Sequence, residues 1–434
     1  MNNVSRRKFL AATGTLLAGA GASQLPFFNR KTPPSDTLYV GLIGCRSMGF
    51  GNLENMLRVD GVHCAALCDV DGQILESRAG DVERITGKRP ALFRDYRRML
   101  ERKDLDAVII GTPDHWHCLQ TVHALEAGKH IYVEKPLANT IREIEIVRDA
   151  AGRYGQLLQV GQQQRSSQHW KNAVERVQSG DLGKIREVSL WGNFGYGAGA
   201  EPVKDTPVPS HVDYDMWLGP APERLFNENH FHGSWRFYWP YGGGVQTDWG
   251  VHLLDIAIWA MQPGRLPRSV YSTGGIFSGL NRSIDAADTQ ATLYNFDKYF
   301  FEWKHTGGVE TPAPYQRNYG IAFVGNQGTL VVNRESWEII PAPGSSLEKD
   351  EGPGSGNDHY LHAKNFVESI RGNETLNAPV ETGYTAALYA HSGNVSYRSG
   401  DTLYWNEEGE LENAEKYRNL LTPHYRNPWT LPSV

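Results

Sequence analysis

The chain has 434 residues, of which 40% are hydrophobic, and a formal net charge of −6 at pH 7. This length is sufficient for two domains with their own cores. The acidic balance gives no basic surface for nucleic acid, so we expect no such partner. The cysteines show no paired metal-type spacing, and we expect small core residues without a disulfide framework. They are Cys45, Cys64, Cys68 and Cys118.

The first residues have the pattern of an export signal. Ser5-Arg6-Arg7-Lys8-Phe9-Leu10 precedes a weakly apolar stretch rich in Gly and Ala, with small-residue cleavage sites near Ala20 or Ala22. The paired arginines indicate a twin-arginine signal, whereas the short length and the glycines argue against a membrane-spanning helix. We therefore expect residues 1–35 to be signal and linker, the twin-arginine machinery to be a partner, and the protein to be periplasmic or otherwise exported.

A dinucleotide-binding pattern follows. Residues 38–43 read as an apolar strand, and Gly44-Cys45-Arg46-Ser47-Met48-Gly49 then leads into a helical pattern. Strand, glycine turn and helix in this order are the context of a dinucleotide fingerprint. Arg46 stands where the middle glycine is usual, so its side chain either reaches a phosphate or weakens the site. A second strand, 62–68, ends in Asp69, which is placed to bind ribose hydroxyls and to repel a 2′-phosphate, so NAD is favoured over NADP.

Two further strands end in polar residues. Residues 106–111 run into Thr112-Pro113-Asp114-His115-Trp116-His117, and residues 131–133 run into Glu134-Lys135-Pro136. Ligands bind outside the carboxyl ends of strands in open α/β sheets, so the Lys135 amine is expected to face a ligand. The proline also makes a cis Lys135–Pro136 bond possible. Strands alternate with helices throughout, which predicts a doubly wound parallel sheet over residues 36–165.

These motifs together resemble the glucose–fructose oxidoreductase/inositol dehydrogenase family, Gfo/Idh/MocA, of which Glu-Lys-Pro is the most specific element. The resemblance implies a Rossmann domain, a nicotinamide cofactor and a carbohydrate or cyclitol substrate. We expect tightly bound NAD. The residues expected to bind it are Gly44, Arg46, Ser47, Met48, Gly49, Asp69, Thr112, Pro113, His117, Glu134 and Lys135.

The second half of the chain differs in its expected secondary structure, because strands follow one another without intervening helices. This pattern predicts a large, mostly antiparallel open sheet, so the fold class is α/β plus α+β. The resemblance implies that residues 166–434 form the substrate and oligomerisation domain, and that the chain is a homo-oligomer through this sheet. Residues 341–356 read as a loop. The expected strands are 185–194, 269–277, 289–296, 299–304, 320–324, 329–333 and 337–340.

A helical pattern begins at Asp248 and places Asp248 and His252 on one face. The residues alone favour a helix-capping Asp and a satisfied core His. The resemblance implies instead that Lys135, Asp248 and His252 form a catalytic set. Several His residues could supply metal ligands, but no recognised metal motif is present, and we expect no metal. The predicted substrate-binding residues are Gln163, Arg165, Trp235 and Arg236.

The motifs and the resemblance together predict an exported, NAD-linked carbohydrate oxidoreductase. In it, His252 takes a hydroxyl proton, Lys135 stabilises the alkoxide and Asp248 orients the imidazole. Outside the cytoplasm NADH is not readily recycled, so the bound cofactor would be reoxidised by a second substrate or by a cycle that closes on one substrate. The latter is a glycosidase that works by oxidation, elimination, hydration and reduction, although Lys135 argues against the α-N-acetylgalactosaminidase subgroup. A non-catalytic sugar sensor is the third alternative, which Arg46 favours mildly and the retention of Lys135, Asp248 and His252 argues against.

Overall fold

The structure is a computed structural model that describes residues 37–264, 266–279, 282–311 and 314–434. The export signal expected over residues 1–35 lies outside the described residues. None of the described helices is both long enough and apolar enough to cross a membrane.

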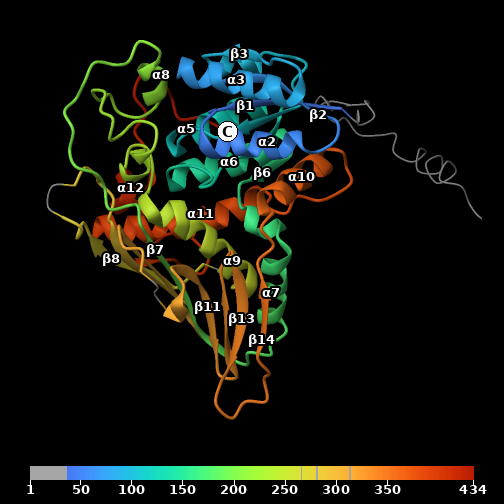
Figure 1. Cartoon of the computed structure of the whole chain (residues 1–434). Helices are drawn as coiled ribbons and strands as arrows, with labels where there is room; N and C mark the ends of the chain where they lie inside the picture. The colour runs from blue at the N-terminus through green and yellow to red at the C-terminus, as the bar shows by residue number, and fades with distance from the viewer. Residues whose placement is uncertain (1–36, 265, 280–281, 312–313) are drawn as a thin grey trace, which may run out of the picture. The chain divides into compact units, whose positions relative to one another are not determined.

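Within the described residues, six parallel strands form the first sheet, in the order β3-β2-β1-β4-β5-β6. This arrangement, in the upper part of Figure 1, confirms the predicted doubly wound sheet. The strand order reverses between β1 and β4, which is where such sheets bind their ligands. The strands are β1 Leu38–Ile43, β2 Val62–Cys68, β3 Ala91–Phe93, β4 Ala107–Ile110, β5 His130–Val133 and β6 Leu158–Val160. The helices are α2 Ser47–Leu57, α3 Gly72–Thr86, α4 Tyr96–Leu100, α5 Asp114–Glu126 and α6 Ile141–Tyr154.

Three glycines bring the ends of β1, β4 and the start of α2 into backbone contact. Gly44 has a φ of +84°, and a Cβ atom there would lie 2.8 Å from the Gly111 carbonyl. A Cβ atom on Gly49 would lie 2.1 Å from the Gly44 carbonyl oxygen, and one on Gly111 would lie 2.5 Å from the Gly49 Cα atom. The turn predicted from sequence is therefore closed by a third glycine, at the end of the neighbouring strand.

The second sheet contains nine strands in the described part of the chain, in the order β14-β13-β12-β11-β7-β10-β9-β8-β15. Only the central β7–β10 pair is parallel, so the expected mostly antiparallel open sheet is confirmed. The strands are β7 Ile185–Phe194, β8 Ser269–Gly275, β9 Thr289–Asn295, β10 Phe300–Gly307, β11 Tyr319–Gly325, β12 Gly328–Val332, β13 Ser336–Pro341, β14 Asp350–Pro353 and β15 Leu403–Tyr404.

Two local expectations were wrong. The segment 341–356, expected to be a loop, contains β14, which pairs antiparallel with β13. The helix expected to begin at Asp248 begins earlier, with a π-type turn over Gln246–Gly250, and continues as α9 over Val251–Met261. A π-turn carries an extra residue in the helical repeat and is common at functional sites.

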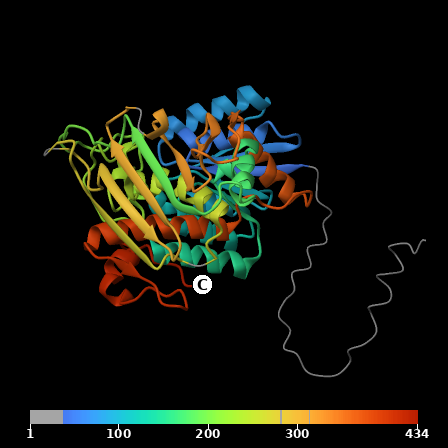
Figure 2. The ribbon, with the colours of Figure 1, turned by 90° about the horizontal axis from the view of Figure 1, so that it is seen from below.

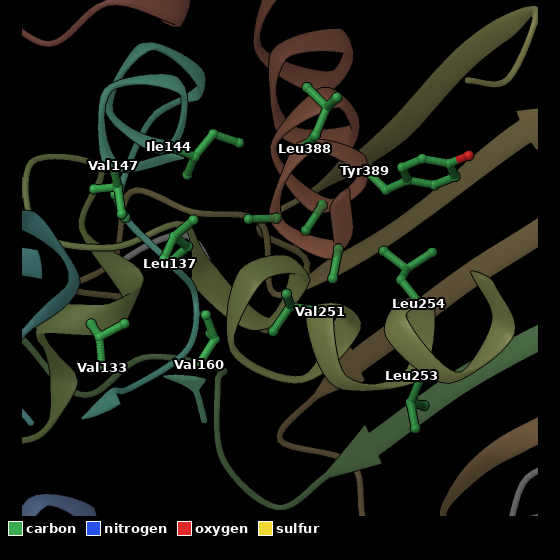
Figure 3. Packing of buried hydrophobic residues seen from close by; sticks show 14 of the residues in the cluster. Val133, Leu137, Ile144, Val147, Val160, Val251, Leu253, Leu254, Leu388 and Tyr389 are labelled. Atoms are coloured by element: carbon green, nitrogen blue, oxygen red, sulfur yellow. The ribbon is translucent and has the colours of Figure 1, made fainter. Parts of the chain in front are cut away.

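Helices lie on one side of the open sheet (Figure 2), where they contact it and also pack against the first domain. Figure 3 shows the shared core, in which Val133 and Leu137 near β5 face the same cluster as Val251 of α9 and Leu388 of α11. One continuous apolar core therefore fixes the two sheets relative to each other. The remaining helices are α7 Gln168–Gln178, α8 Tyr214–Leu218, α10 Asp358–Ile370, α11 Val380–Ser399 and α12 Arg418–Leu421. Single helical turns are Gln163–Ser166, Ser234–Phe237, Pro314–Gln316 and Ala414–Tyr417.

Helix α10 follows the open sheet in sequence but packs on the first domain. Its Phe366 and Val367 are fully buried in the cluster that contains Val40 and Leu53. Its His362 carbonyl also accepts a hydrogen bond from Gln159 Nε2 in β6, at 2.9 Å. The core of the nucleotide-binding domain is thus completed by residues far beyond the predicted domain boundary at 165.

We predict that Gly49→Ala destabilises the fold and weakens NAD binding, because its Cβ atom would overlap the Gly44 carbonyl oxygen. Overpacking of this kind costs roughly 1–3 kcal/mol of the free energy of unfolding. Gly51→Ala in the same helix is the matched control, since nothing lies within 4 Å of its Cβ position. Urea denaturation of both variants measures the difference, and equal stability would contradict the close backbone contact.

Candidate active site

A cavity of about 520 Å³ lies where the carboxyl ends of β1, β4 and β5 meet residues from the second half of the chain. That volume suits a small-molecule ligand. Residues from the first domain line one part of it: Gly44, Arg46, Ser47, Met48, Asp69, Val70, Gly111, Thr112, Pro113, Asp114, Glu134, Lys135 and Gln163. Residues from the second half line the rest: Tyr196, Trp217, His232, Gly233, Ser234, Trp235, Arg236, Phe237, Asp248, Trp249, His252, Arg334 and His359.

The glycine turn is braced by Asp69 at the end of β2. One Asp69 carboxylate oxygen accepts from the Cys45 N–H at 2.7 Å, and the other accepts from the Asp71 N–H at 2.9 Å. Burial raises the pKa of Asp69, and these two N–H donors oppose that rise. Asp69 still lines the cavity, so the carboxylate both shapes the turn and faces a bound ligand.

Arg46 lies at the N-cap of α2, and its side chain is exposed on the cavity wall. Its positive charge acts on Asp69, lowering the pKa of that carboxyl. The close contact between Gly44 and Gly111 leaves backbone without side chains on this part of the cavity wall, so a dinucleotide can approach the backbone closely. The residues present therefore fit a dinucleotide, with Arg46 on the side from which it can reach a phosphate.

Lys135 and Asp248 form the central contact of the cavity. The Lys135–Pro136 bond is cis, and Lys135 Nζ donates to Asp248 Oδ1 at 2.6 Å and to the Asp248 carbonyl oxygen at 2.8 Å. The Tyr196 hydroxyl donates to Asp248 Oδ2 at 3.0 Å, and Arg236 Nε donates to Oδ1 at 3.2 Å. Burial opposes the charge on Asp248, but Lys135 and Arg236 hold the pKa of Asp248 well below its usual range.

His252 lines the cavity and is only 4% exposed. Burial lowers the pKa of His252 well below its usual value, and the nearby charge of Lys135 lowers it further. Its Nδ1 atom has no hydrogen-bond partner among the described residues. Burial and the neighbouring cations therefore favour the neutral imidazole, which lies in the cavity wall.

The expected orientation of His252 by Asp248 is not found. None of the hydrogen bonds between described side chains joins the two residues, and both Asp248 oxygens are engaged by Lys135, Tyr196 and Arg236. The reason is that the ammonium and guanidinium groups compete more strongly for a carboxylate than a neutral imidazole does. Asp248 thus holds Lys135, and His252 stands beside the ion cluster.

Three expected contacts with ligands are also corrected. His117 is fully buried, and its ring nitrogens lie 2.7 Å from the Pro136 carbonyl oxygen and 2.9 Å from that of Thr112, so it joins two loops behind the cavity. The Arg165 guanidinium is held by Asp255 at 2.8 Å and does not line the cavity. Gly49 contributes through backbone packing, as described above, and does not line the cavity either.

Several residues that line the cavity were not predicted from the sequence. Asp114 lies in the quoted strand-end motif, and its position after Pro113 was the available signal. Burial raises the pKa of Asp114 well above its usual value despite the nearby charges of Arg236 and Lys135. Burial thus favours the neutral form of this carboxyl, which is the form that can donate a hydrogen bond. No local pattern marked other lining residues, among them Tyr196, Trp217, Arg334 and His359.

The His residues considered as metal ligands do not converge. Across the described residues, no group of three or more His, Cys, Asp or Glu side chains is placed to hold a metal ion. His232 Nε2 lies 2.7 Å from Asp71 Oδ2, at the start of α3. His115 contacts the Trp217 carbonyl at 3.1 Å. These two imidazoles therefore serve local packing between the two halves of the chain.

Two family profiles match the chain. One, described as an oxidoreductase family with an NAD-binding Rossmann fold, matches residues 38–162, and the other, the C-terminal alpha/beta domain of the same family, matches residues 171–266. The chain belongs to the Gfo/Idh/MocA oxidoreductase family. Its cofactor is NAD, as the NAD-binding profile and the glycine turn agree.

The chain is also similar to curated proteins over part of its length. A glycosyl hydrolase family 109 protein of Shewanella pealeana is 34% identical over 170 residues, which are 35% of this chain and 37% of that protein. An α-N-acetylgalactosaminidase of Shewanella oneidensis is 28% identical over 261 residues, 55% of this chain and 51% of that protein. The matched regions thus span between a third and a half of these relatives.

Solved structures of family members share the fold. The WlbA dehydrogenase of Bordetella pertussis, in complex with NADH and UDP-GlcNAcA, superposes with a TM-score of 0.63 at 20% identity, over 85% of this chain and 99% of that one. Levoglucosan dehydrogenase, in complex with NADH and levoglucosan, gives a TM-score of 0.64 at 20% identity with the same coverage. At this identity the likeness concerns the fold alone.

We predict that Asp69→Ser reduces the preference for NAD over NADP. The carboxylate repels a 2′-phosphate, and removing a like charge from a binding site shifts relative affinity by roughly 10-fold or more. Calorimetric titration of apoprotein with each dinucleotide measures the ratio of dissociation constants. If NAD and NADP weaken equally, Asp69 acts only by bracing the turn at Cys45.

Proposed function

We propose that this family member oxidises a CH–OH group of a sugar, cyclitol or glycoside, with tightly held NAD that is recycled in place. The observation that carries the proposal is the ion cluster of Lys135 and Asp248, which shares one cavity with the glycine turn and with the neutral His252. The carbohydrate ligands named for WlbA dehydrogenase and levoglucosan dehydrogenase support this substrate class.

Bound NAD supplies a hydride acceptor in this scheme, and the chain supplies the proton chemistry. His252 accepts the hydroxyl proton, because it lines the cavity and its surroundings favour the neutral imidazole. The Lys135 ammonium stabilises the negative charge that develops on the substrate oxygen. Asp248 acts by holding Lys135 at a fixed position, together with Tyr196.

Asp114 and the aromatic walls complete the proposed mechanism. Asp114 lines the cavity, and because burial favours its neutral form, we assign it a hydrogen bond to another substrate oxygen that orients the ring. Trp235 and Phe237 are buried and line the cavity, which limits the access of water to the reacting atoms. An enclosed site of this kind also favours retention of the cofactor between turnovers.

We predict that Lys135→Ala and His252→Ala each lower turnover by about 100-fold or more, in line with electrostatic and general acid–base contributions. The measurement is the growth of the NADH absorbance band after NAD-loaded protein is mixed with a panel of sugars and glycosides. Lys103→Ala and His63→Ala are matched controls, since both side chains are exposed away from the cavity.

His252→Ala and Lys135→Ala also show which of the two residues accepts the proton. If His252→Ala reduces the cofactor at the wild-type rate while Lys135→Ala does not, Lys135 is the proton acceptor. If wild-type protein binds sugars but reduces no NAD with any of them, and releases no aglycone, it is a sugar sensor. The glycine contacts at the turn argue against the sensor, because a chain without cofactor has no need of them.

A redox-neutral glycosidase is the second candidate, and the glycosyl hydrolase family 109 relatives favour it. In that cycle the sugar is oxidised, the aglycone is eliminated, water adds to the double bond, and the ketone is reduced by the hydride first removed. Nitrophenyl glycosides distinguish the two functions. Release of nitrophenol without net sugar oxidation supports the glycosidase, whereas an oxidised sugar with its aglycone intact supports the oxidoreductase.

We also propose that the protein is exported through the twin-arginine route, on the strength of Arg6 and Arg7 in the sequence. The open sheet is the proposed surface for homo-oligomer formation. Its strands carry exposed apolar side chains at Tyr271, Leu293 and Phe300, of which Tyr271 and Leu293 are paired across β8 and β9, and contiguous exposed apolar side chains support a contact surface.

For export, the expected outcome of changing Arg6 and Arg7 to Lys is retention of folded, NAD-bound protein in the cytoplasm, because the machinery reads the arginine pair. Cell fractionation followed by immunoblotting measures this. Arg30→Lys, outside the pair, is the control. Unchanged export of the double variant would mean that the segment is not a twin-arginine signal.

A further inference from the structure

Arg334 is a cation in the cavity wall that has no carboxylate partner among the described residues. It lies between β12 and β13, and its guanidinium stands 4.5 Å from the centre of the Trp249 ring. The acidic side chains nearest in sequence are engaged elsewhere. Glu335 accepts from the Tyr319 hydroxyl at 2.8 Å, and Glu338 accepts from Arg317 at 2.8 Å.

The turn that carries Arg334 is built to hold it in place. Asn333 Oδ1 accepts from the Glu335 N–H at 3.1 Å and from the Ser336 N–H at 3.0 Å. Trp249 is itself stacked on Phe194, with ring centroids 4.6 Å apart. The guanidinium is therefore preorganised on a rigid surface, which lowers the entropy cost of binding a ligand.

Arg334 lies on the substrate side of the cavity, close to the proposed proton acceptor. Its positive charge is among the causes that lower the pKa of His252, after burial and Lys135, and it also lowers the pKa of His359. The glycine turn and Asp69, which face the dinucleotide, belong to the opposite domain. The guanidinium is therefore placed for the substrate.

Arg334 differs from the other cations of this part of the cavity. Lys135 and Arg236 both contact the Asp248 carboxylate, and Glu134 lines the cavity beside Lys135. Arg334 has no such contact among the described residues, so its charge is available to an anionic ligand.

We propose that the sugar accepted by this cavity carries an anionic substituent, a uronic carboxylate or a sulfate ester, which Arg334 binds with paired hydrogen bonds. Guanidinium groups match both anions in geometry. The inference rests on the proposed function and narrows it, since it names the charge of the substrate. Arg334 would be a specificity residue, remote from the bond that reacts.

The test compares matched ligands on NAD-loaded protein. The probes are methyl glucopyranosides and galactopyranosides of both anomers, the corresponding methyl uronates and the corresponding 6-sulfates. Calorimetry measures affinity, and the NADH band measures kcat/KM. We expect the uronates or the 6-sulfates to be favoured over the neutral glycosides by about 10- to 100-fold, the range for a charge-assisted contact. The preferred anion identifies the substituent.

Arg334→Gln should remove this preference, which is measured as the ratio of kcat/KM between the anionic and the neutral glycoside on the same variant, so that any general change in rate cancels. Arg398→Gln is the matched control, because that guanidinium stands 4.6 Å from the Trp239 ring but outside the cavity, and its preference should be unchanged. Neutral glycosides that react as well as anionic ones would overturn the inference and leave the oxidoreductase intact. A protein that binds and oxidises none of the panel would overturn the proposed function, and the inference with it.

Discussion

The contact between Lys135 and Asp248 is the constraint on which the cavity depends. The ammonium comes from the end of a parallel strand, and the carboxylate comes from the π-turn that opens α9. Two buried charges are stable together only when their geometry is good and their other hydrogen-bonding positions are filled. Tyr196 and Arg236 fill those positions, so Lys135 and Tyr196 from distant parts of the chain meet Arg236 from a nearby turn at one carboxylate. The ion pair thus fixes the distance between the nucleotide turn and the substrate wall.

A continuous apolar core makes that geometry possible. Side chains around β5 and α6 pack in the same cluster as α9 and α11, as Figure 3 shows, so the cavity walls do not rest on a flexible linker. The glycine contacts among residues 44, 49 and 111 act in the same way on the nucleotide side, where backbone meets backbone. Preorganisation of both walls is what electrostatic stabilisation of an alkoxide requires.

Local sequence patterns predict those parts of the molecule whose structure depends on neighbouring residues. Strand–turn–helix alternation predicted the parallel sheet, and Lys135 was singled out because it follows a buried strand. Side chains were misjudged where their partners lie far away in the chain. Arg165 and His117 are polar residues near strand ends. However, Arg165 forms an ion pair with Asp255, and His117 contacts two backbone carbonyls, so neither side chain faces a ligand. Arg334 reaches the cavity from the turn between β12 and β13, and His359 reaches it from α10, a placement that no local sequence period predicts.

The packing of α10 on the first domain has a consequence for biosynthesis. During translation, the Rossmann segment emerges from the ribosome long before residues 358–370, whose Phe366 and Val367 complete its apolar cluster. Until that helix arrives, the nascent domain exposes the surface that α10 covers, beside α2 at the nucleotide turn. A chain that ends before residue 358 therefore lacks part of the apolar scaffold that holds α2, the helix that follows the nucleotide turn.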